Sequence, residues 1–357
     1  MGRSMRLEKR EHTAPLALLL APLGALGFTL LVGALLVVWA GAPVARTFLL
    51  LLQGGLGSVF AISETLTRAI PLMLTGLAAT VAFKARLFNI GAEGQLYMGA
   101  LAAVAVGGLH GGTGWGLPLA VLFVLMMLAA ALAGALLLLG PALLKVRLGV
   151  DEVVTTLLLN FIVLLLVSLM LDGPMKDPTA MGWPQSVALL SELELSKLIA
   201  QTRVHSGLLW ALALAIGLWT LLKYTVLGFD IRALGANPRA AAFAGVPVTR
   251  TVVLVALLSG GLAGLAGAIE VAGRTSYLTL DMSPGYGYSG IVIAMLAALH
   301  PLAVVGASVF VASVIVGADS MSRAVGVPTF IADCMVAAAL ISVLVATLLT
   351  QYRVRWR

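Results

Sequence analysis

The chain has 357 residues, of which 61% are hydrophobic and only 10% are charged, and its mean hydropathy is +1.08. A soluble domain carries about 25% charged residues, so this composition excludes a soluble globular protein. The net charge of +7 would suggest nucleic-acid binding in a soluble protein, but here the basic residues form small groups between long apolar runs, as is typical of membrane proteins.

The apolar runs predict an all-α, polytopic membrane protein with about ten transmembrane helices. The first run, 16–40, is too long for the apolar core of a signal peptide, so we expect it to be retained as a span. Charges, prolines and glycine clusters bound the other runs. The predicted spans are 16–40, 69–83, 90–109, 117–143, 151–171, 207–223, 251–272, 285–299, 301–318 and 327–350.

The distribution of basic residues predicts the orientation of these spans. With the N-terminus in the cytoplasm, fifteen of the 22 Lys and Arg residues fall on the cytoplasmic side and seven on the external side. Cytoplasmic loops carry an excess of positive charge, so this orientation is favoured over its inverse. We therefore expect a cytoplasmic tail over 1–15, a transmembrane domain over 16–350 and a cytoplasmic tail over 351–357.

Two segments between spans carry further expectations. The segment 47–60 is apolar but interrupted by Gly54, Gly55 and Gly57, and we interpret it as an interfacial or re-entrant helix. The longest external loop, 172–206, contains SELELSKL, which favours a short surface helix. This loop is either a contact site for a soluble partner or a solvated connector.

Three polar residues lie at the start of the span 90–109. They are Asn89, Glu93 and Gln95. A carboxylate at this depth is costly unless it faces a cavity or a polar partner, and Glu93 lies one helical turn beyond Asn89, on the same face. The three residues either line a transport pathway or form structural pairs, for which Lys84 and Arg86 are candidate partners.

Other polar and small residues likewise allow either a transport role or a structural role. Asn160 lies mid-span and can hydrogen-bond a polar solute or a neighbouring helix. Glu270, Asp319 and Asp333 lie near span ends, where snorkelling to water lowers the cost of their charges. The segment Ser259–Glu270, SGGLAGLAGAIE, carries small residues at helical spacing, which predicts close helix packing or, alternatively, a channel lined by small residues.

The segment Gly285–Gly290 has the sequence GYGYSG, which matches the dinucleotide-binding pattern G-x-G-x-x-G. A dinucleotide site needs a preceding strand within a βαβ unit, and the surrounding sequence supplies neither. We expect these glycines to open a half-helix or a mobile entrance. Tyr286 and Tyr288 offer rings that can stack on a cyclic solute, or they belong to an interfacial aromatic belt.

The cytoplasmic loop 224–250 contains the most informative local pattern. Asn237 is a natural N-cap, Pro238 fits the first turn of a helix, and Gly245 suits its end. A short helix of small residues flanked by arginines is suited to docking in a groove of another protein, although an ordinary interhelical loop has a similar composition. The residues that define this feature are Arg232, Gly235, Asn237, Pro238, Arg239, Ala241 and Gly245.

Four stretches carry a family resemblance. IRALGANPRAAAFAGVPVTR, residues 231–250, resembles the ATPase-coupling loop of permease subunits in the branched-chain amino acid, ribose and nucleoside branch of ATP-binding-cassette importers. FKARLFNIGAEGQLYMGA, residues 83–100, and GYGYSGIVIAMLAALHPLAVV, residues 285–305, resemble signatures of the simple-sugar and purine-nucleoside permeases. LKVRLGVDEVVTTLLLNFI, residues 144–162, is a further match, except that Asp151 stands where asparagine is expected.

The resemblance covers nearly the whole chain and implies a permease subunit of an ATP-driven importer. Such a subunit would form half of a translocation channel for a nucleoside or simple-sugar-like solute in the bacterial inner (plasma) membrane. The implied partners are cytoplasmic ATP-binding subunits, an external solute-binding lipoprotein and a second homologous permease, in a heterodimer or a homodimer. The candidate pathway residues are Asn89, Glu93, Gln95, Asn160, Tyr286 and Tyr288.

The chain carries no motif of its own for ATP hydrolysis. It has no G-x-x-x-x-G-K-[ST] segment, and its four histidines lack metal-ligand spacing. We therefore expect a transport subunit without enzymatic activity, metal or cofactor, with ATP and Mg²⁺ bound by a separate ATPase. The alternative is a secondary transporter driven by an ion gradient, which would use intramembrane carboxylates such as Glu93.

Overall fold

The computed structural model describes residues 5–9, 15–109, 116–326 and 328–356. They form two compact units, which are described separately: unit 1 contains the residues up to Thr65 and from Phe310 onward, and unit 2 contains Leu66–Val309. Helices account for most of both units, so the predicted helical class is confirmed. Among the basic residues used to predict orientation, Arg3, Arg10 and Arg357 lie outside the described residues.

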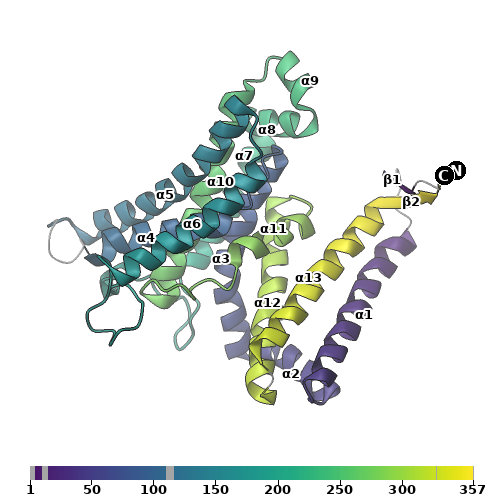
Figure 1. The fold of residues 1–357 in the computed structure, drawn as a ribbon, viewed down its shortest axis with the longest axis horizontal. Helices are drawn as coiled ribbons and strands as arrows, with labels where there is room; N and C mark the ends of the chain where they lie inside the picture. The colour runs from purple at the N-terminus through teal and green to yellow at the C-terminus, as the bar shows by residue number, and fades with distance from the viewer. Residues whose placement is uncertain (1–4, 10–14, 110–115, 327, 357) are drawn as a thin grey trace. The chain divides into compact units, whose positions relative to one another are not determined.

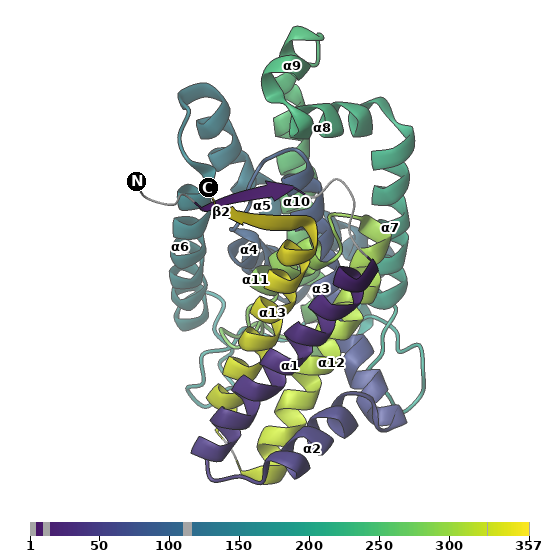
Figure 2. The same ribbon diagram turned by 90° about the vertical axis from the view of Figure 1, so that its right-hand side faces the viewer.

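In unit 1 the two ends of the chain lie side by side. α1 (Pro15–Trp39) packs along α13 (Thr329–Gln351), as both views show (Figures 1 and 2). β1 (Met5–Lys9) pairs with β2 (Tyr352–Trp356) in an antiparallel ribbon, which the sequence did not predict. The buried core of this unit contains Val37, Ala318, Met321 and Met335.

The segment predicted as interfacial or re-entrant forms α2 (Val44–Leu56). The axes of α1 and α2 differ in direction by 117°, which is the geometry of a broken span or a re-entrant loop. Gly54 and Gly55 lie inside α2, where the absence of side chains lets its backbone approach Ser313 and Ser320 of α12 (Pro301–Val325). These glycines therefore serve helix packing and do not interrupt the helix.

Unit 2 is built around α10 (Val248–Glu270), which packs against both α4 (Ala92–Val104) and α5 (Leu119–Leu148) (Figure 1). α4 and α10 each end in a π-helical turn, at Ala105–Leu109 and Val271–Thr275. The unit also contains the end of α3 (Val59–Lys84), α6 (Glu152–Asp172), α7 (Gly207–Tyr224), α8 (Val226–Ala236), α9 (Pro238–Phe243), α11 (Tyr286–Leu296) and the start of α12.

A helix occupies each of the ten predicted spans, but the helices differ in length. Among the described residues, six helices are long and apolar enough to cross a membrane, or seven if α1 and α2 count as one bent span. α11 has 11 residues, which at 1.5 Å per residue extend about half of a 30 Å hydrocarbon layer. The number of crossings, about ten, stays a prediction.

The small residues of α10 pack closely against two neighbouring helices, as predicted. A methyl group at Gly264 would come within 3.0 Å of the Ala130 carbonyl in α5, and one at Gly267 would come as close to the Leu96 carbonyl in α4. Backbones can approach this closely only where side chains are absent. The packing interpretation of Ser259–Glu270 is therefore confirmed.

The long loop between α6 and α7 differs from its prediction. SELELSKL forms only a three-residue 3₁₀ turn, Ser191–Leu193, where a short surface helix was expected. Leu193 and Leu195 are both buried, and this spacing of two residues belongs to extended backbone. The Leu195 amide donates to the Ala272 carbonyl at 2.8 Å, so the segment is fixed along the end of α10. Tertiary contacts thus override the local helical pattern.

Candidate functional site

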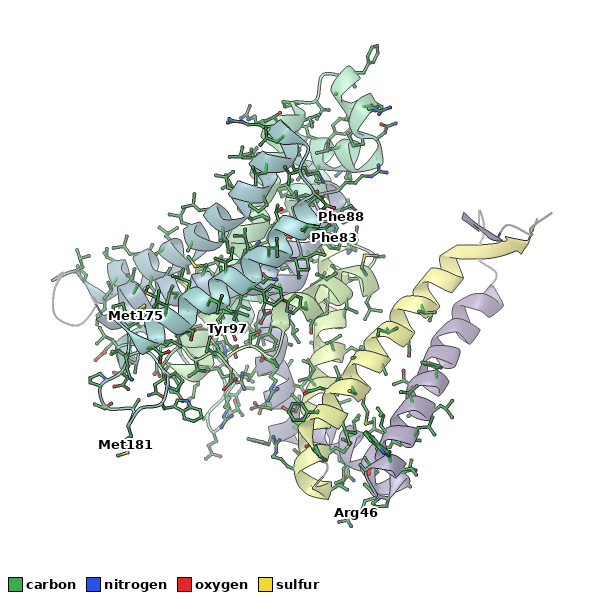
Figure 3. All side chains as sticks on the ribbon, in the orientation of Figure 1. Arg46, Phe83, Phe88, Tyr97, Met175 and Met181 are labelled. Atoms are coloured by element: carbon green, nitrogen blue, oxygen red, sulfur yellow. The ribbon has the colours of Figure 1, made fainter. Side chains whose placement is uncertain are left out.

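Two of the breaks in the helical backbone of unit 2 are held by buried polar side chains. The first break, residues 85–91, separates α3 from α4, and the second break, residues 276–285, precedes α11. In hydrocarbon, the amides of non-helical backbone need protein partners because water is absent. Phe88 in the first break and Tyr97, which contacts the second, are labelled in Figure 3.

A polar stripe on α6 holds the first break. Glu152, Thr156 and Asn160 recur every four residues, so they share one face of the helix. Each side-chain oxygen accepts a hydrogen bond from a backbone amide in or beside the first break. The pairs are Phe88 N–H to Glu152 at 3.1 Å, Ile90 N–H to Thr156 at 3.2 Å and Gly94 N–H to Asn160 at 2.8 Å. The stripe thus supplies hydrogen-bond acceptors to backbone amides that have no helical partner.

Asn89 and Gln95 form a reciprocal pair inside the same region. Their side-chain amides exchange two hydrogen bonds, of 2.8 and 2.9 Å. Asn89 also donates to Ser259 of α10 at 3.1 Å, and the Ser259 hydroxyl donates to the Ala78 carbonyl of α3 at 2.8 Å. The two predicted pathway residues are therefore brought together as a link between α3, α4 and α10.

Two residues of α4 hold the second break in the same manner. Glu93 accepts a 2.6 Å hydrogen bond from the Gly287 amide at the start of α11, and further bonds from the Gly285 amide and the Ser283 hydroxyl. Tyr97, one turn farther along, donates to the Leu280 carbonyl. Glu93 thus caps α11, where the positive end of the helix dipole favours a carboxylate.

The contacts of Glu93 correct one of its two interpretations. The structural interpretation named Lys84 and Arg86 as partners, but the carboxylate is held by the second break. Arg86 donates to the Ala236 carbonyl at the end of α8, at 3.1 Å. At this end of the unit Lys145 contacts Glu152 and donates to the Arg86 carbonyl at 2.7 Å.

The glycine-rich segment opens α11, as predicted for a half-helix. Gly285 has a φ of +86°, which favours glycine, and a methyl group at Gly287 would come within 3.0 Å of the Glu93 backbone. Tyr286 is buried, and its hydroxyl accepts from Arg274 at 3.3 Å. Tyr288 is 39% exposed and accepts from Asn160 at 3.1 Å.

The six candidate pathway residues differ in how exposed their side chains are. Among them, Tyr288 keeps a substantial exposed surface, whereas the other five, all described by the structure, are at most 3% exposed. Of these six residues, Tyr288 is thus the one whose side chain keeps an accessible face. Asn160 and Glu93 bind backbone amides next to the two breaks. Asn89 and Gln95 bind each other, and the Tyr286 hydroxyl accepts from Arg274.

Glu270 does not reach water by snorkelling. Its side chain is fully buried at the end of α10 and pairs with Arg274, one turn farther on, at 2.6 Å. Arg274 also contacts the Tyr286 hydroxyl, so the pair connects the end of α10 with the start of α11. A buried ion pair is costly to break because one charge would be left without its partner.

The predicted cytoplasmic helix is α9. The Asn237 side chain accepts from the amides of Arg239 at 3.0 Å and Ala240 at 3.2 Å, Pro238 is its first residue, and Gly245, with a φ of +87°, follows its end. Figures 1 and 2 show α9 at one end of unit 2 and the loop between α6 and α7 at the opposite end.

The surface of α9 has two distinct sides. Ala241 is 4% exposed and packs within the chain, whereas the Phe243 ring is 97% exposed. Gly235, before α9, lies so close to the Lys84 carbonyl that a methyl group would overlap it. Together with the hydrogen bond from Arg86 to Ala236, this contact joins the α8–α9 segment to the first break.

Sequence reasoning missed Glu152 and Thr156. Their signal was the four-residue spacing to Asn160 within an otherwise apolar run, which places three polar groups on one face. Asp151, the one departure from the family pattern, caps α6 by accepting from the Val153 amide at 2.8 Å. Aspartate and asparagine are similarly good N-caps, so the departure leaves this local structure unchanged.

His205 lies buried at the end of the long loop. Its Nδ1 accepts from the Gly207 amide at 3.2 Å, and Nε2 has no hydrogen-bond partner among the described residues. The ring is pressed against Gly273. Burial, assisted by the positive charge of Arg274, lowers the pKa of His205 from 6.5 to about 4.

Mild acid is therefore expected to destabilise the fold through His205. Between pH 6.5 and about pH 4, His205 binds a proton in the unfolded chain but stays neutral in the folded chain. The free energy of unfolding should fall by about 1.4 kcal/mol per pH unit across this window. Thermal unfolding in detergent at pH 7.5 and 5.0 checks this, with His205→Gln as comparison. An equal loss of stability in the variant and the natural protein would contradict it.

The fold and the two breaks define a class. Long apolar helices combined with discontinuous helices, whose freed backbone groups are held by buried polar side chains, characterise membrane transport proteins. Residues 61–344 match the family described as the permease component of branched-chain amino acid transport systems, and the chain belongs to this family. It is thus the permease subunit of an ATP-binding-cassette importer, as the sequence motifs predicted.

Three curated proteins are similar over most of their length. The guanosine ABC transporter permease of Bacillus subtilis (strain 168) is 34% identical, covering 89% of this chain and 91% of its own. The glucose ABC transporter permease of Haloferax volcanii is 37% identical, over 84% and 80% of the two chains. The nucleoside ABC transporter permease of Lactococcus lactis subsp. cremoris is 29% identical, over 89% and 88%.

Proposed function

We propose that this permease forms half of the channel of an importer for nucleosides or simple sugars in the bacterial inner membrane. The named cargoes of similar permeases, guanosine, nucleosides and glucose, support this solute class. All are polar and cyclic. The ring of Tyr288, with its exposed face and hydroxyl, suits stacking and hydrogen bonding to such solutes.

In the proposed topology, about ten helices cross the membrane and both termini are cytoplasmic. The excess of basic residues on one side supports this orientation. It puts α9 in the cytoplasm and the loop 172–206 outside. An external solute-binding lipoprotein would deliver solute on the loop side, and a second homologous permease, identical or not, would complete the channel.

The observation that carries the coupling proposal is the Phe243 ring, 97% exposed on the capped helix α9. An aromatic ring displayed on a rigid support is a typical anchor at protein interfaces. We assign it to a groove of an ATP-binding subunit, which binds ATP and Mg²⁺. Movement of α9 would reach the first break through the contacts of Gly235 and Ala236.

An ion-gradient mechanism gains no support from the carboxylate it would use. Glu93 is 3% exposed and accepts hydrogen bonds from the Gly287 amide of α11 and from two donors of the second break. A cation site would need these oxygens to face a cavity. Membership of the permease family likewise favours ATP-driven import.

Removing the Phe243 ring tests the coupling proposal. In vesicles containing the permease with its ATP-binding, second-permease and solute-binding partners, Phe243→Ala should reduce solute-stimulated ATP hydrolysis by at least about tenfold, the size of an interface anchor. Guanosine and glucose serve as the stimulating solutes. A tryptophan at Ala241 would test this contact less cleanly. Ala241 is buried, so the larger side chain would distort α9 itself.

The matched control is Phe229→Ala, which removes an aromatic ring that is 59% exposed on α8 in the same cytoplasmic loop. We expect this variant to keep its stimulated hydrolysis. If Phe243→Ala retained full stimulation, or if the two variants lost it equally, α9 would not be the specific contact. Absence of stimulation by either solute in the natural protein would reject the proposed solute class.

A further inference from the structure

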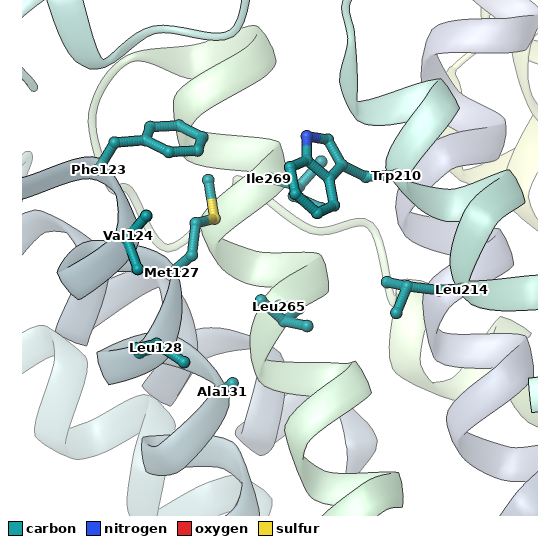
Figure 4. Close-up of a pocket in the computed structure, with 9 residues that line it drawn as sticks. All are labelled: Phe123, Val124, Met127, Leu128, Ala131, Trp210, Leu214, Leu265 and Ile269. Atoms are coloured by element: carbon teal, nitrogen blue, oxygen red, sulfur yellow. The ribbon is translucent and has the colours of Figure 1, made fainter. Parts of the chain in front are cut away.

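An apolar groove lies on unit 2. α10 forms its floor with Leu265 and Ile269, and α5 and α7 form its walls (Figure 4). Its volume is about 350 Å³, within the range of ligand pockets. The remaining lining residues are Phe123, Val124, Met127, Leu128, Ala131, Trp210 and Leu214.

The groove is open at the surface of the helices. Val124, Leu128 and Trp210 line it, yet each is more than half exposed. All nine lining side chains are aliphatic, aromatic or thioether groups, so the groove offers nothing to a polar solute. On a membrane-spanning unit, an open apolar groove of this kind suits a hydrocarbon chain.

A basic hairpin stands at one end of the groove. Residues 197–205 form a hairpin, in which the backbones of Lys197 and His205 pair in an antiparallel β-bridge. The Leu198 amide donates to the Val204 carbonyl at 2.8 Å. The hairpin leads directly into α7. A methyl group at Gly207, the first residue of α7, would lie 2.7 Å from the Ile269 side chain, so the hairpin adjoins the groove floor.

The hairpin combines charge with exposed apolar groups. Lys197 and Arg203 are exposed, and between them Leu198 and Ile199 are 41% and 51% exposed. Trp210, one turn into α7, is a residue type enriched at membrane–water interfaces. The basic groups are thus followed by an amphipathic aromatic residue and then by the apolar groove. A phospholipid in a bilayer has the same order: a headgroup, an interfacial region and an acyl chain.

We propose that this groove is a binding site for an anionic phospholipid of the surrounding bilayer. The acyl chain occupies the groove beside Trp210 and Leu265, and the phosphate lies against Lys197. The charge of the hairpin selects an anionic over a zwitterionic headgroup. The inference goes beyond solute transport and does not depend on the proposed ATPase contact.

Quenching of Trp210 by brominated lipids tests the site. The full chain is reconstituted in nanodiscs of dioleoylphosphatidylcholine containing brominated phosphatidylglycerol or brominated phosphatidylcholine at equal mole fraction. The signal of Trp210 is the difference between the natural protein and Trp210→Phe. We expect phosphatidylglycerol to quench this signal at about fivefold lower mole fraction than phosphatidylcholine, the preference that one lysine supplies.

Two lysine variants complete the test. Lys197→Gln should abolish the preference, whereas Lys176→Gln, which removes another exposed lysine of the same loop, should preserve it. Equal quenching by both lipids in the natural protein would overturn the proposal, as would a preference that survives Lys197→Gln. Absence of any Trp210 quenching would show that protein covers the groove, which also overturns it.

Discussion

Replacing Gly267 by alanine is expected to prevent this permease from reaching a stable fold. The added methyl group would come within 3.0 Å of the Leu96 carbonyl and the Ala100 amide, both backbone atoms of α4. Neither helix can rotate away, because α10 is also pressed against α5 through Gly260 and Gly264. Overpacking costs about 1–3 kcal/mol where side chains can yield, and here only backbone is available.

The measurement is the yield of monodisperse protein after extraction in mild detergent, followed by its thermal unfolding. We expect Gly267→Ala to lower the yield at least about tenfold, because a loss of about 1–2 kcal/mol already changes the abundance of a folded protein several-fold. Gly261→Ala is the matched control on the same helix, since the atom nearest to its methyl group would be the Ala131 carbonyl at 3.6 Å. Equal yields from the two variants would show that α4 and α10 are not packed this closely.

The segment Ser259–Glu270 shows how much of the helix packing could be predicted from the sequence. SGGLAGLAGAIE predicted a close contact, because small residues at helical spacing have few other uses in a membrane helix. It could not name the partners, because the pattern describes one surface only. That Gly264 meets α5 while Gly267 meets α4 depends on how three helices cross.

α9 was predicted more completely because its signals are local. The side chain of Asn237 reaches amides two and three residues ahead, and Pro238 and Gly245 act through their own backbone angles. Which side of the helix faces outward was not predictable, since burial of Ala241 and exposure of Phe243 depend on the packing of α8, α9 and α10.

The polar residues within spans were the hardest to interpret. A polar side chain in an apolar run suggests a pathway, because its most obvious partner is a solute or water. Asn160 and Glu93 instead bind backbone amides exposed by the two breaks, and those amides are invisible to side-chain patterns. The hypothesis of a half-helix opening at Gly285 was the one clue that such partners exist.

Removing the Glu93 carboxylate is accordingly expected to destabilise unit 2 and, as a consequence, to abolish transport. In Glu93→Ala the Gly285 and Gly287 amides and the Ser283 hydroxyl would lose a buried acceptor. Each buried donor left without a partner costs about 1–3 kcal/mol, so the total exceeds about 3 kcal/mol. Thermal unfolding in detergent and solute uptake in vesicles should both be impaired.

Glu93→Gln distinguishes a structural role from a pathway role. Glutamine keeps one carbonyl oxygen at this position, which can satisfy two of the three donors, so its stability should lie between those of the natural protein and Glu93→Ala. Uptake should follow the same order, because in this interpretation transport fails only through the loss of the capped α11. Glu192→Ala, which removes an exposed carboxylate of the long loop, should change neither property. If Glu93→Gln unfolded like the natural protein yet carried no solute, the charge itself would be needed, and Glu93 would belong to the pathway after all.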